Sequence, residues 1–315
     1  WLAPQAEALG VEIYPGFAAA EPLFDDAGAG AGVRIGDLGV NKEGGHKPNY
    51  TPGIDIKAGI TILAEGCRGS LSKQLIKRYG LDQGRSPQTY SIGLKELWQV
   101  PAGRAQPGLV QHTQGWPLDR KTYGGSFVYH LDQDRIAIGF IVGLDYQNPH
   151  LEPFELFQQF KHHPVIKGLL EGGTIISAGA RAIITGGWQS LPKLEMPGAL
   201  LVGDAAGMLN VPKIKGTHMA MWSGMQAAEH LAANLSSAGF DAKWRASASA
   251  RELHKVRNIH AGFRWGLWGG LANAALETAV GGRTPWTLAN HADWSSLKRL
   301  SEVDAVRRDF GARDL

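Results

Sequence analysis

The spacing of apolar and polar residues predicts a chain that changes texture along its length. The first 85 residues hold short apolar runs separated by glycine-rich turns, with a helix predicted over residues 71–79. After residue 88, four runs with strand periodicity follow one another: Tyr90–Val100, Leu109–Gly115, Gly125–Leu131 and Arg135–Leu144. These runs predict an antiparallel sheet inserted into an α/β framework.

Helical and strand patterns alternate on both sides of the predicted sheet. After it, Glu152–Leu170 predicts a helix, Thr174–Ile184 a strand and Trp244–Lys255 a further helix. Before it, residues 1–9 predict the end of an amphipathic helix, and Val11–Phe17 predicts a short strand.

Alternating Gly and Ala residues at 28–32 invite comparison with a dinucleotide-binding loop. No strand ends directly before them, no helix follows, and Asp25 and Asp26 would repel a phosphate. A hairpin turn between strands Ala18–Leu23 and Val33–Val40 is therefore the better interpretation.

The stretch from 198 to 235 organises the second half of the chain. An apolar run of strand length ends at Gly203 and Asp204, where small residues let a backbone approach a ligand closely. A loop rich in Gly, Pro and Lys follows, and then a helix that Thr217 can cap. Gly224 in that helix costs about 1 kcal/mol against alanine, which predicts close packing on a neighbour.

This order of strand, carboxylate, glycine-rich turn and helix suits a phosphate-bearing cofactor. Asp204 would meet sugar hydroxyls, and the anion would lie at the helix N-terminus. The alternative is an ordinary helix cap at the end of a strand. Lys213 and Lys215 in the loop would pair with phosphate or face solvent. His218 would be a proton carrier or a structural histidine.

A second strand, glycine turn and helix run through Ala64–Ser72. Cys67 is interpreted there as a small turn residue. Glu65 and Arg68 would form a surface pair or contact a ligand. The histidine pair at 162–163 faces two directions on a helix and is interpreted as a solvated helix end, not as a metal site.

Two adjacent glycines, Gly124 and Gly125, stand within the predicted sheet between Tyr123 and Phe127. Adjacent glycines leave backbone N–H groups open to a ligand carbonyl, and the two aromatic rings offer flat apolar walls. The alternative is a β-bulge or turn.

The most membrane-like stretch is Trp265–Leu276, which is far shorter than the roughly 20 apolar residues a spanning helix needs. Its tryptophans and the preceding Arg257 and Arg264 fit a helix lying in the bilayer interface, with the arginines near headgroups. A protein core would bury the same side chains as readily.

Composition narrows the class of protein. With 43% hydrophobic and 19% charged residues the chain can build a core, and its formal charge of +3 does not suggest a nucleic-acid partner. The single cysteine excludes a disulfide framework and a four-cysteine cluster within these 315 residues. No initiator Met and no signal peptide are seen, so we expect an interior piece of a longer chain.

The string VGDAAGMLNVPKIKGTH, followed by AMWSGMQAAE, closely resembles a flavin-contacting segment of the electron-transfer flavoprotein:ubiquinone oxidoreductases, relatives of the geranylgeranyl reductases. The likeness runs from about Leu9 to Ser301. It implies a mixed α/β (α+β) fold, a glutathione-reductase-like FAD domain with an inserted antiparallel-sheet quinone-binding domain. The implied parts are FAD domain 1–85 and 188–257, quinone domain 86–187, and a membrane-surface helix and tail 258–315.

The resemblance also implies roles for particular residues, none of them catalytic and none a metal ligand. FAD would contact Gly203, Asp204, Ala205, Gly207, Gly216 and Thr217. Ubiquinone would contact Tyr123, Gly124, Gly125 and Phe127. The membrane would contact Phe263, Trp265, Leu267, Trp268 and Leu271.

The implied function is that of an oxidoreductase passing electrons from reduced electron transfer flavoprotein, through FAD and a [4Fe–4S] cluster, to ubiquinone. The cluster ligands and the amino-terminal FAD loop would lie outside this chain, making it a central fragment. The implied location is the surface of a bacterial inner membrane, on its cytoplasmic face, or of the mitochondrial inner membrane, on its matrix face. Two alternatives are a geranylgeranyl-reductase-like FAD enzyme and a non-catalytic membrane- or quinone-binding fragment.

Overall fold

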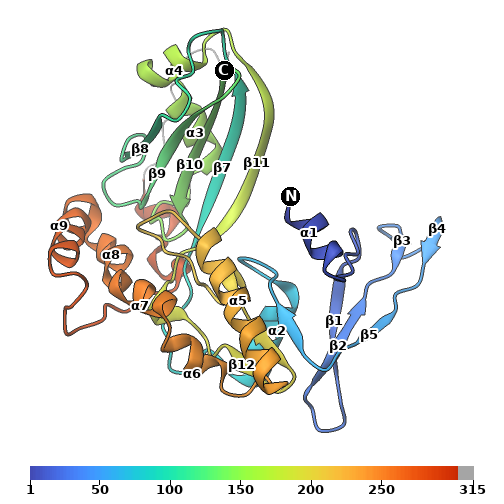
Figure 1. Ribbon diagram of the computed structural model, residues 1–315. Coiled ribbons are helices and arrows are strands. Elements are labelled where there is room, and N and C mark those ends of the chain that lie inside the picture. The colour runs from blue at the N-terminus through green and yellow to red at the C-terminus, as the bar shows by residue number, and fades with distance from the viewer. Residues whose placement is uncertain (304–315) are drawn as a thin grey trace.

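The computed structural model describes residues 1–303, and its elements form an α/β part with a large sheet standing above it (Figure 1). The large sheet has five antiparallel strands in the order β11-β7-β10-β9-β8. Their bounds are β7 Tyr90–Gln99, β8 Val110–Gln114, β9 Gly124–Leu131, β10 Arg135–Gly143 and β11 Thr174–Ile184. The inserted antiparallel sheet predicted from the sequence is confirmed.

One face of this sheet is covered by helices α3 (Pro153–Lys161) and α4 (Pro164–Leu170). Alternate strand residues such as Val128 and Ile138 point into this layer and are fully buried. The single helix predicted over 152–170 is wrong. Proline cannot continue a helix hydrogen-bond ladder, and the chain restarts at Pro164.

The α/β part is built on a small sheet of order β12-β13-β6, comprising Glu195–Met196, Ala199–Leu201 and Thr61–Leu63. Strands β13 and β6 are parallel. Around them lie helices α2 (Ser70–Tyr79), α5 (Thr217–Asn234), α6 (Phe240–Arg245) and α7 (Ala248–Lys255). The helix predicted over 244–255 is thus in two pieces, and Ser247 caps the second by accepting from the Ala250 N–H.

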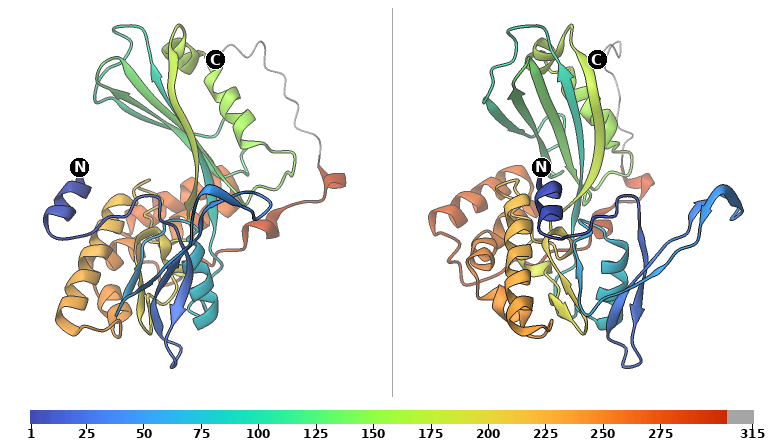
Figure 2. Two further views of the ribbon diagram at one scale, coloured as in Figure 1. Left: turned by 90° about the vertical axis from the view of Figure 1, so that its right-hand side faces the viewer. Right: turned by 45° about the vertical axis from the view of Figure 1, so that its right-hand side comes forward.

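The first 60 residues form a peripheral region. Helix α1 (Leu2–Ala8) has no buried residue, and β1 (Ala19–Phe24), β2 (Gly30–Ile35) and β5 (Asp55–Lys57) form a three-stranded sheet. A ribbon of β3 (Leu38–Val40) and β4 (His46–Thr51) projects away from the body (Figures 1 and 2).

Two expectations about this region have different outcomes. The hairpin turn at 25–29 is confirmed, since the Ala29 N–H donates to Asp25 Oδ1 over 2.8 Å. The strand predicted over Val11–Phe17 is wrong, because that segment has no strand partner among the described residues and its side chains are exposed.

After α7 the chain forms α8 (Arg257–Gly262), the 3₁₀ turn η3 (Phe263–Trp265) and α9 (Gly266–Ala279). None of the helices within residues 1–303 has the length and apolar character required to cross a bilayer. Short 3₁₀ turns at Trp188–Ser190 (η1), Gly203–Ala205 (η2), Asp293–Ser296 (η4) and Leu300–Glu302 (η5) complete the chain. The end of the tail expected over 258–315 lies outside the described residues.

Candidate functional site

Two glycine turns meet where the parallel strands β6 and β13 end. Leu63 pairs with Leu201, so the turn after β6 and the turn η2 after β13 leave the same edge of the sheet. Ligands of open α/β sheets bind outside the carboxyl ends of such strands. Cys67 and Asp204 are close enough that burial and the Asp204 charge together raise the pKa of the thiol to about 11.

Gly203 is required at the start of η2 for two reasons. Its φ is +58°, a left-handed conformation that favours glycine, and a Cβ there would lie 3.1 Å from the Ala220 Cβ on α5. Its N–H donates to Ser223 Oγ over 2.9 Å. The turn therefore rests directly on α5. Gly224, in contrast, has open space around it, so its predicted close packing is wrong for the described residues.

Asp204 provides the clearest sign of a ligand. Its Oδ1 is buried and has no hydrogen-bond partner among the described residues, and burial raises the pKa of its carboxyl. A buried acceptor left unpaired is unfavourable, so the site fits a molecule that brings a hydroxyl or N–H donor. A Cβ on Gly216 would lie 3.4 Å from this oxygen. Asp204 and Gly216, separated by 12 positions, thus share one site.

The remaining predicted cofactor residues lie around the same turn. Ala205 is buried in η2, and the Gly207 N–H donates to the Asp204 backbone oxygen over 3.1 Å. Thr217 does not cap α5, which corrects the expectation. Gly216 already has helical backbone angles and is itself the cap residue, with no side-chain cap bond. The start of α5 therefore presents backbone N–H groups suited to an anion.

The loop between η2 and α5 is held by a residue that the sequence did not single out. Lys213 Nζ lies 2.9 Å and His218 Nε2 3.1 Å from Glu252 Oε1 on α7. Both side chains are therefore engaged structurally, and Lys213 is occupied by a carboxylate in place of a phosphate. Lys215 Nζ lies 5.9 Å from the centre of the Tyr129 ring. The one sequence signal for Glu252 was the charged face of its helix.

Glu65 is also structural. Its carboxylate accepts from the Leu71 N–H at 3.0 Å and from the Ser72 N–H at 2.6 Å, which satisfies the start of α2. It does not form the surface pair with Arg68 that the sequence allowed. The Arg68 guanidinium instead lies 5.2 Å from the centre of the Tyr90 ring.

Gly124 and Gly125 both lie in β9, between β8 and β10. A Cβ on Gly124 would overlap the carbonyl oxygen of Ile141, and one on Gly125 would overlap that of Thr113. Close approach of the neighbouring strands therefore explains both glycines. Phe127, two residues after Gly125, stacks on Tyr129 with ring centroids 4.5 Å apart.

Tyr123 joins the large sheet to α8 and to the turn η3 that follows it. Its ring centroid is 4.6 Å from that of His260 and 5.1 Å from that of Phe263. Burial raises the pKa of Tyr123 to about 12 and lowers the pKa of His260 to about 4. The predicted quinone segment and the predicted membrane segment are thus in contact.

A narrow cleft follows this contact. Tyr123, Phe263 and Leu267 line it together with residues 114–115 and 119–122. The Leu267 N–H donates to the Arg120 backbone oxygen over 2.7 Å, which ties α9 to the loop between β8 and β9.

The segment around η3 and α9 places apolar side chains on the surface. Trp265 is 53% and Trp268 66% exposed, and Leu271 is also exposed. Phe263 and Leu267 are half-buried against the sheet loop. These exposures favour the surface interpretation over the core alternative.

Arg257 corrects one detail of that interpretation. It is only 6% exposed and donates to the backbone oxygens of Gly282 at 2.8 Å and Thr284 at 2.6 Å. It therefore braces the following turn and cannot lie near headgroups. Arg264 is exposed, with its guanidinium 5.2 Å from the centre of the Trp265 ring.

Asp145 and Asp293 lie at the foot of the large sheet, and the sequence did not single out either of them. Asp293 Oδ2 accepts from the Tyr90 N–H over 3.0 Å, while its Oδ1 is buried without a partner in the described part of the chain. Burial raises the pKa of Asp293 to about 6, and the nearby Asp145 charge adds to this. Asp293 lies 203 positions from Tyr90, so no local sequence pattern could predict this hydrogen bond.

Comparison with known proteins links these features to one group of relatives. Residues 90–183 match the family model described as "ETF-QO, ubiquinone-binding". The chain is 48% identical over 324 residues to the mitochondrial electron transfer flavoprotein-ubiquinone oxidoreductase of Homo sapiens, covering 97% of this chain and 52% of that protein. For the Pseudomonas aeruginosa relative of the same name, identity is 47% over 318 residues, covering 97% and 58%. The chain spans about half the length of the curated relatives it matches.

Solved structures share the fold at lower identity. A flavin-dependent brominase matches with a TM-score of 0.57 at 14% identity, covering 89% of this chain and 68% of that one. A geranylgeranyl bacteriochlorophyll reductase-like protein from Thermoplasma acidophilum matches with a TM-score of 0.56 at 17% identity, covering 94% and 63%. The predicted mixed α/β fold of the FAD-dependent type is confirmed.

Proposed function

We propose, from the premise that this chain belongs to the family of the electron transfer flavoprotein-ubiquinone oxidoreductases, that it is part of a flavoprotein passing electrons from reduced electron transfer flavoprotein to ubiquinone at a membrane. One observation carries the proposal furthest. Tyr123, within the region matched as ubiquinone-binding, touches Phe263 at the edge of an exposed apolar surface. A lipid-soluble substrate would reach its site from such a surface.

In this proposal the edge beyond β6 and β13 holds FAD. Asp204 Oδ1 would accept a hydrogen bond from a hydroxyl of the cofactor, and the start of α5 would face its anionic part. Gly216 keeps a Cβ atom away from Asp204 Oδ1, and Gly203 lets the turn rest against Ala220 of α5. Ala205, Gly207 and Thr217 complete the contact. When bound, FAD supplies the electron-carrying chemistry, and the protein supplies its position and surroundings.

The proposed quinone site is formed by Tyr123, Gly124, Gly125 and Phe127. The half-buried Tyr123 ring would provide an apolar wall, and its hydroxyl, whose pKa is raised to about 12 by the surrounding protein, stays protonated at neutral pH. A protonated phenol can donate a hydrogen bond to a quinone oxygen. Phe127, within β9, would provide a second flat surface.

The proposed membrane contact is made by Phe263, Trp265, Leu267, Trp268 and Leu271. Exposed tryptophans beside a basic residue, here Arg264, fit a helix lying in the interface without crossing it. The proposed location is the bacterial inner membrane, on its cytoplasmic face, or the mitochondrial inner membrane, on its matrix face. With Cys67 as the single cysteine, a [4Fe–4S] cluster of the whole protein would take its ligands from outside these 315 residues.

We also propose the division inferred from sequence, with FAD-domain parts 1–85 and 188–257, a quinone domain 86–187 and a membrane segment and tail from 258. A reductase of isoprenoid double bonds is the second candidate, favoured by the structural likeness to the Thermoplasma acidophilum protein. That likeness is at 17% identity, against 48% to the human oxidoreductase, so it ranks second.

The mass and visible spectrum of the protein purified from its native source test the proposal. We expect a chain longer than 33.9 kDa with flavin bands and a broad iron–sulfur shoulder. Flavin bands without the shoulder would favour the reductase alternative. A colourless 33.9 kDa chain would contradict catalysis by this polypeptide alone and leave a binding module.

A further inference from the structure

One carboxylate oxygen accepts hydrogen bonds from three side chains in the loop that links η2 to α5 and in the first turn of α5. Glu252 Oε1 on α7 lies 2.8 Å from Asn210 Nδ2, 2.9 Å from Lys213 Nζ and 3.1 Å from His218 Nε2. These donors come from the start of the loop, its middle and the first turn of α5. A single acceptor therefore fixes the loop at three points.

The environment keeps this acceptor charged. Burial by itself raises the pKa of the Glu252 carboxyl, but the hydrogen bonds from Lys213, His218 and Asn210 outweigh it and hold the pKa at about 2. Asn210 is fully buried, with 0% exposure, so its amide depends on protein partners. Hydrogen bonds to a charged acceptor are the stronger kind.

The rest of the loop is organised around the same point. Asn210 and Lys215 form a backbone bridge, with N–O distances of 3.2 and 3.3 Å in the two directions. Between them the chain turns through Ile214, whose φ is +54°. A non-glycine residue in this conformation needs its surroundings to hold it.

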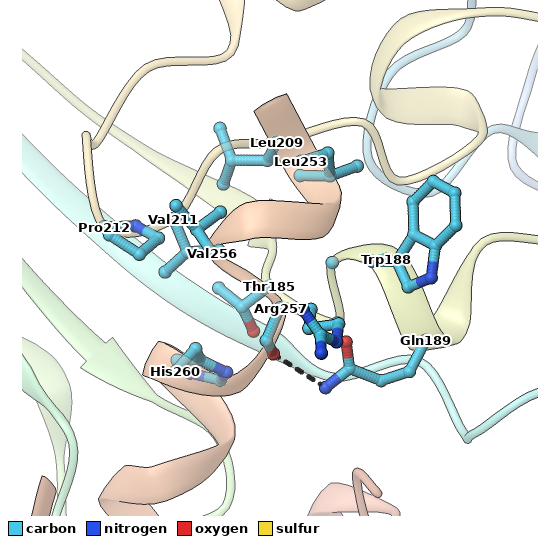
Figure 3. Close-up of a pocket in the computed structure, with 12 residues that line it drawn as sticks. Thr185, Trp188, Gln189, Leu209, Val211, Pro212, Leu253, Val256, Arg257 and His260 are labelled. Carbon is cyan, nitrogen blue, oxygen red and sulfur yellow. Dashed lines mark hydrogen bonds between the residues drawn. The ribbon is translucent and has the colours of Figure 1, made fainter. Parts of the chain in front are cut away.

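Apolar contacts alone do not define where the loop sits. Figure 3 shows Leu209, Val211 and Pro212 of the loop beside Leu253 and Val256 of the α7 region, around a small pocket. Such contacts resist separation of the two surfaces but are non-directional. The directional anchor on α7 is Glu252.

The far end of the loop lies at the proposed flavin site. A Cβ on Gly216 would lie 2.8 Å from Leu209 Cδ1 and 3.4 Å from Asp204 Oδ1, so loop position and the unpartnered carboxylate oxygen are set together. Any shift of the loop would therefore change the space at Asp204.

We propose that Glu252 is a positioning residue for the cofactor. Through Asn210, Lys213 and His218 it holds residues 208–217 in the shape that the flavin meets, without touching the flavin itself. The role rests on the proposed function, but the clamp itself belongs to the loop and can be tested without activity.

Hydrogen exchange tests the clamp in the purified protein of natural length. We expect Glu252→Gln to speed exchange of backbone amides in residues 208–218 by about tenfold or more, since the three loop donors would then meet a neutral acceptor in place of a charged one. Glu252→Asp should recover part of the protection. Glu229→Gln, an exposed glutamate later on α5, is the matched control and should change nothing.

Amides of β10 serve as an internal reference for global stability. Faster exchange in β10 as well as in the loop would show a general loss of stability and overturn the positioning role. Unchanged exchange in the loop would overturn the clamp.

The flavin spectrum and the flavin reduction potential provide the second measurement. We expect Glu252→Gln to shift the visible absorption bands or the potential, with Glu229→Gln at the wild-type values. Loosened exchange with an unaltered flavin would overturn the positioning role. If the wild-type protein carries no flavin, the proposed function fails, while the exchange result still decides the clamp.

Discussion

At the scale of single residues, the Asp204 carboxylate is unfavourable for stability in the protein alone and becomes favourable when a ligand donates a hydrogen bond to it. Its buried Oδ1 has no partner in the described residues, and burial raises the pKa of its carboxyl. Residues of this kind tend to mark functional sites, because selection for function keeps a group that stability alone would remove.

Replacement of Asp204 should therefore separate stability from binding. We expect Asp204→Ala to lower FAD affinity by about tenfold or more, since one hydrogen bond to a charged group is lost. The free energy of unfolding of the flavin-free protein should stay equal or rise. Fluorescence titration with FAD and urea unfolding measure the two quantities. Asp26→Ala in the exposed hairpin turn is the control, and equal FAD affinity in both variants would contradict the assignment.

Asp293 should make stability depend on pH. Burial raises its pKa from the ordinary 3.8 to about 6 in the folded state, so the folded protein binds this proton more tightly than the unfolded chain. Its contribution is present below about pH 4 and is lost as the pH rises through 6. After allowance for solvent screening we expect the loss to be about 1 kcal/mol.

Urea unfolding at pH 4.5 and pH 7.5 measures this dependence. The difference between wild type and Asp293→Asn isolates the residue from other titrating groups. A pH dependence that is the same in both proteins would contradict the account.

At the scale of elements, we expect a Gly→Ala substitution to have opposite effects on stability in β9 and in β11. A Cβ on Gly125 in β9 would overlap the Thr113 carbonyl oxygen, whereas one on Gly179 in β11 meets nothing within 4 Å. We expect Gly125→Ala to lower the unfolding free energy by about 1–3 kcal/mol. Gly179→Ala should leave it equal or slightly higher. Thermal unfolding of the two variants decides this, and similar melting temperatures would show that β9 is less tightly packed than described.

The η3–α9 segment should carry membrane binding. We expect Trp268→Ser to weaken binding to phospholipid vesicles by about tenfold, because one large apolar side chain contributes about 1.5–3 kcal/mol when buried in lipid. Stability should be unaffected, since Trp268 is 66% exposed. Vesicle co-sedimentation measures binding, with Trp294→Ser, 78% exposed in η4, as the control. Undiminished binding of the Trp268 variant would place the membrane contact elsewhere.

At the scale of the whole molecule, elements with strong local patterns could be predicted from the sequence. Strand β9 alternates between buried and half-buried residues, and β10, which contains Ile138, is a nearly continuous apolar run. Strand β11 was predicted at its observed bounds because a long run with clear ends needs no distant information. The turn at Gly203 and Asp204 was found because strand, carboxylate and glycine lie next to one another.

What the sequence could not provide depends on contacts between distant segments. Glu252 and Asp293 gain their roles from partners at least 34 positions away. The sequence predicted that Arg257 lies near lipid headgroups, but its guanidinium is buried and donates to backbone oxygens. The strand predicted at Val11–Phe17 had the right residues, but a strand also needs a neighbour to pair with.

The proposed flavin edge, the proposed quinone segment and an exposed apolar surface lie on one chain. The central claim is that this chain works within an electron transfer flavoprotein-ubiquinone oxidoreductase. The most direct measurement is ubiquinone reduction by the purified protein of natural length, with reduced electron transfer flavoprotein as the sole electron source. We predict one ubiquinone reduced for every two electrons donated, with lower activity in Asp204→Ala at limiting FAD. A flavin-containing protein that leaves the reduced donor unoxidised in the presence of ubiquinone would contradict the account.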